Sequence, residues 1–440
     1  MIPLSFNQDF LCSFDRGDEQ GPFGPRNHIV HGWRVSGDID VETLRLALHD
    51  LVVRHEALRT TVVRGEQRHQ QVHPPQAPEL VLLDVAGVPV DDRDQCVDEL
   101  LNEVEAGTIS GSEIPLIRAA LGRFDDQDAI LVLIAHHTAT DGWSFRVLAR
   151  DLAILYARRR GHQLDLPETV PYQEYARWQR SLTPQALTRQ REYWRDNLAG
   201  ARVFAVPTDR PKSLGLPEST SVHRFVIEAE LVEPTVRLAK ATRSTPFMVL
   251  LAAFNLLAQR MSNTTDVVVP TFSPGRVERF HHTVGPFFNM MPLRTDLSAC
   301  RTFLDVIART RRSCLDGYTN DMPFAMIAGE APELMAPVMT DDQGACVFQV
   351  FPFPFVLDGE LVGDLKYTEM RRRLISQPVG SDVPNGALWT LNLDPGGDVV
   401  GSVQFNSNIY DEVTITEMVA QYRQTLRESV VSPDSYLTLL

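Results

Sequence analysis

Residues 129–145 read AILVLIAHHTATDGWSF, and this stretch decides how the fold is interpreted. Residues 129–135 are a continuous apolar run, as expected of a strand that is covered on both faces. Apolar residues then recur at helical spacing over 145–155, and basic residues with a glycine at 158–161 are typical of a helix end. The sequence therefore predicts a strand, a loop over 136–142 and a helix.

This loop carries the residues best suited to chemistry. A strand-to-helix junction exposes side chains beside a helix N-terminus, whose amides can stabilise developing negative charge. Adjacent residues leaving a strand point to opposite sides, so we expect only one of His136 and His137 to face a reaction centre. His137 lies four residues before Asp141. Because the pKa of histidine is about 6.5, such a side chain can accept or position a proton near neutral pH.

The remaining pattern predicts two α+β lobes. The stretch 163–170 contains proline and lacks a clear period, so we place the boundary there and expect lobes at 1–170 and 171–440. The other elements that we expect are helices at 40–53, 172–178, 247–254 and 415–430, a β-like segment within 54–62, and strands at 266–270, 346–351 and 399–405.

Composition narrows the classes of function. Of 440 residues, 43% are hydrophobic and 22% are charged, which is ordinary for a globular protein. The net charge of −15 disfavours nucleic acid and anionic membrane surfaces as partners. No apolar run reaches membrane-spanning length and no signal peptide is visible, so we expect a cytoplasmic location. Five cysteines without C-x-x-C spacing indicate reduced thiols rather than a zinc site.

The loop sequence HHTATDG resembles the H-H-x-x-x-D-G motif of nonribosomal peptide synthetase condensation domains, in the chloramphenicol-acetyltransferase-like superfamily. Further segments resemble that family in the same order along the chain: Ser5 and Gln8, RHEALRT at 54–60, YQEYARW at 172–178, VGPFFNMMPLR at 284–294 and NDMPF at 320–324. The chain departs from the family pattern at Phe10, where arginine is usual, at Glu174, where aspartate is usual, and over 332–347.

The resemblance implies a V-shaped pseudo-dimer of two acetyltransferase-like lobes with a tunnel between them. It implies a condensation enzyme in which an amine attacks an acyl or aminoacyl thioester to form an amide. The acyl group would be carried on the phosphopantetheine of a partner acyl or peptidyl carrier protein, with no cofactor bound by the chain itself. Because no adenylation or carrier segment is visible, we expect a freestanding enzyme.

The resemblance also assigns roles to residues. It makes His137 the catalytic base or positioning group, with His136, Asp141 and Gly142 as structural or oxyanion support. In the family a distant arginine holds the aspartate, since a buried carboxylate needs a paired cation. We expect Arg276 to fill this role, with Arg294 as the alternative. Trp143, Ser144 and Asn289 are expected to line the tunnel.

Several alternatives remain open at this point. A hydroxyl acceptor would give an ester through the same histidine, and a small-molecule acyltransferase would use acyl-CoA. An epimerisation domain is disfavoured because residues 284–287 read VGPF rather than a V-G-W-F-type segment. A non-catalytic recruitment domain is disfavoured because His137 is present. A metal at the loop is disfavoured because no third ligand motif accompanies it, and His281 and His282 are interpreted as loop residues.

Overall fold

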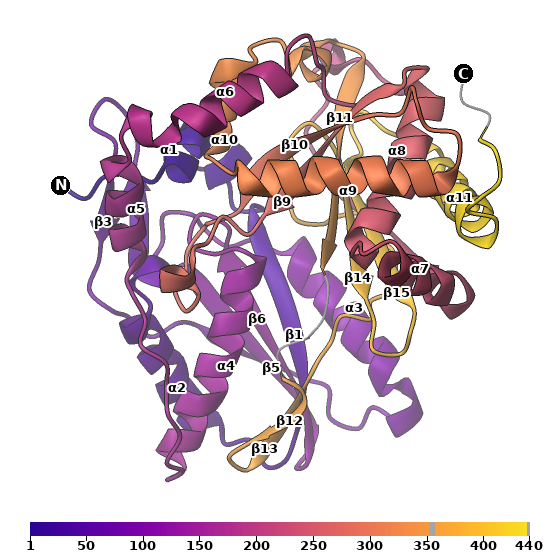
Figure 1. Cartoon of the computed structure of the whole chain (residues 1–440). Helices are drawn as coiled ribbons and strands as arrows, with labels where there is room; N and C mark the ends of the chain where they lie inside the picture. The colour runs from indigo at the N-terminus through magenta and orange to yellow at the C-terminus, as the bar shows by residue number, and fades with distance from the viewer. Residues whose placement is uncertain (352–356, 438–440) are drawn as a thin grey trace.

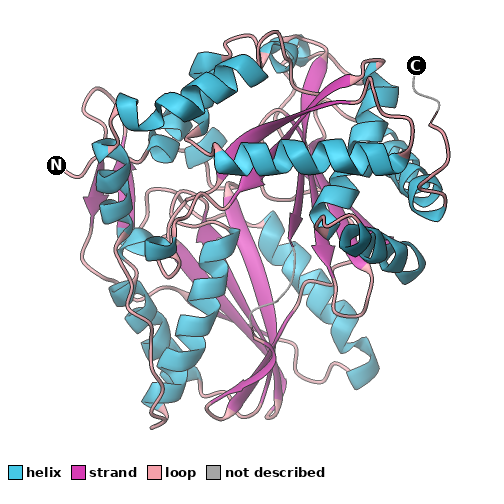
Figure 2. Cartoon of the chain, in the orientation of Figure 1, coloured by secondary structure: helices cyan, strands magenta, loops and turns pink. Residues whose placement is uncertain are grey.

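The computed structural model describes residues 1–351 and 357–437 as an α+β protein with two lobes. In Figure 1 most of the purple elements of the N-terminal lobe lie below most of the orange and yellow elements of the C-terminal lobe. Figure 2 shows strands running through the interior of both lobes with helices outside them. The predicted α+β class is confirmed.

The N-terminal lobe is built on a six-stranded sheet. Its order is β12 (Asp358–Val362), β13 (Leu365–Glu369), β1 (His28–Ser36), β6 (Asp128–His136), β5 (Ile117–Asp125) and β4 (Leu80–Leu83). Helices α2 (Val41–Arg54) and α4 (Gly142–Arg159) contribute to the core on one face, and α3 (Arg93–Ala106) packs on the other. Since β6 is covered on both faces, its residues 129–133 are all buried, as the apolar run predicts.

The C-terminal lobe holds a five-stranded sheet under a layer of helices. Its order is β7 (Ala205–Pro207), β11 (Gln343–Phe351), β14 (Gly386–Leu393), β15 (Val399–Asn406) and β8 (Thr220–Ile227). Its core includes residues of α7 (Ala229–Ala241), α8 (Pro246–Ser262), α9 (Phe303–Thr319) and α11 (Glu412–Val431).

Shorter elements connect the lobes and extend them. These are α1 (Phe6–Cys12), α5 (Tyr172–Ser181), α6 (Thr188–Asn197), α10 (Phe324–Glu330), the hairpin β2 (Thr60–Val63) with β3 (His69–Val72), and the pair β9 (Asp266–Ser273) with β10 (Asn289–Asp296). Residues 56–59 form a 3₁₀ turn, so the β-like segment expected within 54–62 begins only at Thr60. The other predicted helices and strands are present.

The two sheets repeat one topology, as the pseudo-dimer implied by the family resemblance predicts. The neighbours β1, β6, β5 and β4 pair as antiparallel, antiparallel and parallel, and β8, β15, β14 and β11 pair in the same succession. In both lobes the second strand of this set leads through a short loop into a long helix, α4 or α11. The chain is therefore a pseudo-dimer of two related halves.

One segment of the C-terminal half crosses back to the N-terminal sheet. Strands β12 and β13 form a hairpin that pairs with β1, and the orange hairpin lies in the purple half of the molecule in Figure 1. The predicted division at residue 170 does not foresee this crossing, because the hairpin lies nearly two hundred residues beyond that boundary.

Among the described helices, no single one is both long and apolar enough to cross a membrane, and only α7 with α8, bent by 108°, meet the length and composition criteria as a pair.

Candidate active site

The strand-to-helix junction forms where the sequence places it. Strand β6 ends at His136 and helix α4 begins at Gly142. Asp141 is the N-cap of α4, and its Oδ1 accepts a 2.7 Å hydrogen bond from the backbone N–H of Ser144. This contact stabilises the first turn and fixes the end of the loop.

His136 points into the protein. Its side chain is fully buried, with Nε2 3.0 Å from the Gly24 carbonyl oxygen and Nδ1 2.7 Å from the Thr138 hydroxyl. Because a carbonyl oxygen can only accept, Nε2 carries the proton in the neutral ring. Burial lowers the pKa of His136 to about 4. The geometry is that of a neutral, hydrogen-bonded structural histidine.

His137 is half-buried, and only one of its two ring nitrogens has a hydrogen-bond partner among the described residues. Its Nδ1 lies 2.9 Å from the Thr140 carbonyl oxygen, so Nδ1 carries the proton and Nε2 keeps a free lone pair. No described residue forms a hydrogen bond with Nε2. Burial lowers the pKa of His137. The ring is therefore neutral near pH 7 and oriented to accept a proton through Nε2.

Asp141 and Arg276 form a buried ion pair between loops of the two lobes. Arg276 Nη2 lies 2.7 Å from Asp141 Oδ1, and 1% and 5% of the two side chains are exposed. Asp141 Oδ2 accepts the N–H of Phe287 at 3.0 Å, and Arg276 Nη1 donates to the Thr283 carbonyl at 2.6 Å. The aspartate thus holds α4, Arg276 and the segment at Phe287 together.

The alternative arginine, Arg294, is excluded as the partner of Asp141. It pairs with Asp266 on the neighbouring strand at 2.7 Å and donates to the Asn197 carbonyl. Arg294 reaches Asp266 because the two residues are close neighbours across the β9–β10 ladder.

Ser144 lies inside the ion-pair network. Its hydroxyl is 2.8 Å from Asp141 Oδ1, accepts from Arg276 Nη2 at 2.9 Å and from the Gly285 N–H at 3.0 Å, and its side chain is fully buried. This burial differs from the tunnel-lining position that the sequence predicts, because polar neighbours enclose the hydroxyl.

The other expected lining residues have defined contacts. Trp143 is half-buried and donates its Nε1–H to the His281 carbonyl at 2.9 Å. Asn289 donates to Asp321 and accepts the N–H of Phe324, so its amide joins the VGPFFN and NDMPF segments. Gly142 has no Cβ, and one placed there would lie 3.4 Å from Phe351 Cε1, an ordinary van der Waals distance.

Tyr172 is a site-supporting residue to which the sequence analysis assigned no role beyond its place in the YQEYARW segment. Its hydroxyl donates to the Pro286 carbonyl oxygen at 3.0 Å and lies 2.9 Å from the Ser5 hydroxyl. A Cβ at Gly285 would lie 2.0 Å from the Tyr172 ring, so only glycine fits there. The joint presence of Ser5, Tyr172 and the VGPF segment was the signal that could have found this contact.

The pseudo-dimer contains a second loop at the position of the first. The His137 N–H donates to the Asn27 carbonyl at 2.8 Å, and the Ser407 N–H donates to the Ser219 carbonyl at 2.9 Å. By this correspondence, Ser407 occupies the place of His137, and Asp411 precedes α11 as Asp141 precedes α4. The second loop therefore lacks the imidazole.

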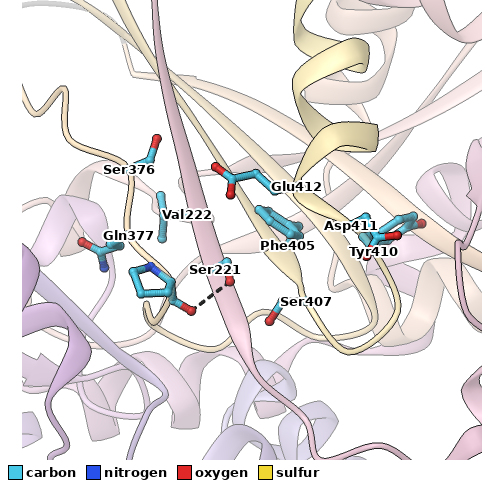
Figure 3. Close-up of a pocket in the computed structure, with 10 residues that line it drawn as sticks. Ser221, Val222, Ser376, Gln377, Phe405, Ser407, Tyr410, Asp411 and Glu412 are labelled. Atoms are coloured by element: carbon cyan, nitrogen blue, oxygen red, sulfur yellow. Dashed lines mark hydrogen bonds between the residues drawn. The ribbon is translucent and has the colours of Figure 1, made fainter.

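A pocket of about 350 Å³ opens at this second loop. Figure 3 shows Ser221, Ser407 and Glu412 around it, with the Ser221 hydroxyl donating to the Pro378 carbonyl. Serine and carboxylate side chains replace the histidine here, so the pocket has no counterpart of the His137 base.

In 1–351 and 357–437, no group of three or more His, Cys, Asp or Glu side chains is arranged to hold a metal ion.

Comparisons with known proteins agree with this geometry. The family model described as "Condensation domain" matches residues 29–438. The probable non-canonical nonribosomal peptide synthetase CymA of Salinispora arenicola is 34% identical across the whole chain, and a linear gramicidin synthase protein of Brevibacillus parabrevis is 30% identical, also across the whole chain. The chain spans only 6% and 8% of these two synthetases.

Solved structures match over the full length as well. The SgcC5 protein from Streptomyces globisporus, in complex with (R)-(-)-1-(2-naphthyl)-1,2-ethanediol and sucrose, is 45% identical, with a TM-score of 0.95 and coverage of 99% of this chain and 100% of SgcC5. The X-domain from teicoplanin biosynthesis shares the fold at 23% identity, with a TM-score of 0.77 and coverage of 100% of this chain and 97% of its own.

Proposed function

Because this chain belongs to the condensation-domain family, we propose that it transfers an acyl group from a carrier-bound thioester to a nucleophilic acceptor at His137. The observation that carries this proposal is the orientation of His137. The Thr140 carbonyl oxygen accepts the hydrogen bond from Nδ1, and Nε2 has no hydrogen-bond partner among the described residues in the loop that leads into α4. A neutral imidazole fixed in this way is ready to accept or position the proton of an attacking group.

The chemistry proceeds through a tetrahedral intermediate. The acceptor heteroatom attacks the thioester carbonyl carbon while its proton moves to, or is held by, His137 Nε2. The carbonyl oxygen gains negative charge, and the backbone N–H of Gly142, in the first turn of α4, is our candidate donor to it. Collapse of the intermediate breaks the carbon–sulfur bond, and the pantetheine thiolate takes up a proton as it leaves.

Asp141 and Arg276 support this chemistry without touching the reacting atoms. Their ion pair fixes the loop from which His137 projects and ties it to Phe287 in the other lobe. We therefore assign both as positioning residues. Preorganisation of this kind matters because a displacement of about 1 Å at a catalytic group lowers rates strongly.

The acceptor can be an amine, giving the amide expected from the family resemblance, or a hydroxyl, giving an ester. A specific observation favours the hydroxyl: the 45% identical SgcC5 structure contains a vicinal diol. The match to SgcC5 covers 99% of this chain and 100% of the SgcC5 chain. We propose a free alcohol acceptor as the second, more specific form of the activity.

The test is a transfer assay with purified chain. Acyl groups loaded on a carrier protein are offered with matched amines and alcohols, and products are identified by mass spectrometry. We expect His137→Ala to lower kcat/KM by about 10²- to 10⁴-fold, the range for loss of a general base. The matched control is His281→Ala, since His281 is exposed on a loop.

Two results would contradict the proposal. Turnover of free acyl-CoA without turnover of any carrier-bound donor would indicate a small-molecule acyltransferase. Absence of transfer from every donor, with intact folding, would favour a recruitment domain without catalysis.

A further inference from the structure

One arginine close to the loop that carries His137 lacks an anionic partner. Arg146 lies near the start of α4 and is half-buried, and no described residue forms an ion pair or a hydrogen bond with its guanidinium group. The guanidinium group instead lies over the ring of Trp143, with Cζ 4.9 Å from the ring centroid. Because a half-buried charge loses part of its hydration, a bound anion would stabilise Arg146 in this position.

The described charges around Arg146 leave an excess of positive charge. Glu369 pairs with Arg371 at 2.6 Å, and Arg150, about one turn further along α4, pairs with Glu360 at 3.3 Å. Burial and the nearby charge of Arg371 lower the pKa of Arg146, whereas Glu369 acts in the opposite direction. We call these five side chains the arginine patch. It sets three guanidinium groups against two carboxylates, in a chain whose net charge is −15.

The arginine patch lies where the two lobes meet. Arg146 follows Gly142, the first residue of α4, by about one helical turn. A Cβ placed at Gly142 would lie 3.4 Å from Phe351 Cε1 at the end of β11, and Trp143 donates its Nε1–H to the His281 carbonyl. Both contacts come from the C-terminal half of the chain. The start of α4 therefore places Arg146 beside the lobe junction and close to the proposed oxyanion donor.

We propose that Arg146 binds the phosphate group of the donor's phosphopantetheine arm and so selects donors that carry this phosphate. The inference rests on the proposed function, in which the donor is a carrier-bound thioester that reacts at His137. The arm must extend from the reaction loop to the carrier protein, and its far end carries an anionic phosphodiester. Guanidinium groups bind phosphate oxygens through charge-assisted hydrogen bonds. The contact with Trp143 holds the guanidinium group in one orientation for this purpose.

The first experiment measures binding without chemistry. Phosphopantetheine and pantetheine differ only by the phosphate group, and their binding to the full chain is compared by calorimetry with no acceptor present. We expect phosphopantetheine to bind about 10-fold more tightly, as one hydrogen bond between charged groups at a half-buried site provides. Arg146→Gln should bring this ratio close to one. Arg146→Lys should retain part of it, because the positive charge stays.

The second experiment measures transfer from two donors that carry the same acyl group. For the carrier-bound donor, Arg146→Gln should raise KM by about 10-fold, and the loss should appear in KM rather than in kcat because the phosphate is remote from the reacting atoms. For the acyl-pantetheine donor, which has no phosphate, KM should stay the same. The matched control is Arg158→Gln, which changes an exposed arginine at the other end of α4 and should retain both ratios. Melting curves confirm that each variant is folded.

The inference is overturned if neither compound binds to the parent chain, if the two bind equally, or if Arg146→Gln keeps the preference for phosphopantetheine. A higher KM for the carrier-bound donor with that preference unchanged would show that Arg146 contacts an acidic side chain of the carrier protein instead. An equal rise in KM for both donors would also overturn it. Failure of the proposed function is separate, because it would appear as absent product from every donor while the phosphate preference in binding persists.

Discussion

At the scale of single residues, two neighbouring histidines have opposite environments. His136 uses both nitrogens inside the protein, whereas His137 uses only Nδ1. The difference follows from the alternation of side chains at the end of β6, which turns one ring inward and the next outward. Burial lowers both pKa values, so both rings are neutral near pH 7.

The lowered pKa of His137 predicts the pH dependence of activity. Nε2 can accept a proton only while the ring is neutral, and burial keeps it neutral to a lower pH than an exposed histidine. We expect kcat/KM to fall on the acid side with a midpoint below about 6.5. This midpoint is measured from initial rates between pH 5 and 8. A midpoint at or above the ordinary histidine value would contradict the assigned role.

His136 predicts a pH dependence of stability. Its pKa is about 4 in the folded chain and about 6.5 unfolded, so below pH 6.5 the unfolded chain binds the extra proton. Unfolding free energy should fall from pH 6.5 towards 4 and then level off, with about 3 kcal/mol lost through this group. Urea unfolding of the parent and His136→Gln at several pH values tests this. If the unfolding free energy of the parent chain and of His136→Gln depended equally on pH, His136 would be excluded as the source of the dependence.

At the scale of elements, helix α4 depends on a partner distant in the sequence. Asp141 caps the helix locally through Ser144, and Arg276 neutralises the same carboxylate from the other lobe. Cap and ion pair therefore stabilise each other.

Removing either member of this pair leaves a buried charge alone. We expect Asp141→Ala and Arg276→Ala each to lower the unfolding free energy by about 3–5 kcal/mol. The double variant should lose less than the sum of the two, because the residues are in direct contact. Urea unfolding of the parent chain, the two single variants and the double variant gives the coupling energy between Asp141 and Arg276. Additive losses would show that the two charges stabilise the fold independently.

At the scale of the whole molecule, a second buried charge cluster joins the lobes. Glu105 on α3 pairs with Arg224 on β8 at 3.1 Å and with Arg373 at 2.7 Å. Asp98, also on α3, accepts the N–H of Leu374 at 2.7 Å. These contacts secure the segment that follows the β12–β13 hairpin between the halves of the pseudo-dimer.

This cluster should contribute more to stability than a surface ion pair. Glu105→Gln leaves two arginines without their shared carboxylate in a site where only 8% of the glutamate is exposed. We expect a loss of about 3 kcal/mol in unfolding free energy. The control, Glu233→Gln, breaks an exposed pair with Arg237 and should cost less than about 1 kcal/mol. Similar losses in both variants would contradict a special role for the interlobe cluster.

The sequence by itself determined those elements of the protein that are formed by residues close together along the chain. The buried strand, the loop with His137 and Asp141, and the helix after it follow from apolar periodicity and a capping residue within 129–161. The family resemblance extended this to Arg276, because in the family a distant arginine holds the aspartate. No physical pattern in the sequence would have chosen Arg276 over Arg294, since both are far from Asp141 along the chain.

Tertiary structure alone decided the rest. The proton position on His137, the burial of Ser144, the return of β12 and β13 to the N-terminal sheet and the arginine patch all depend on contacts between segments distant in sequence. The family resemblance implied the repeated topology, but no residue pattern showed it, because strand pairing requires only matching faces and hydrogen bonds, which many sequences satisfy. Ser407 in place of His137 shows how one half can keep the backbone and lose the reactive side chain.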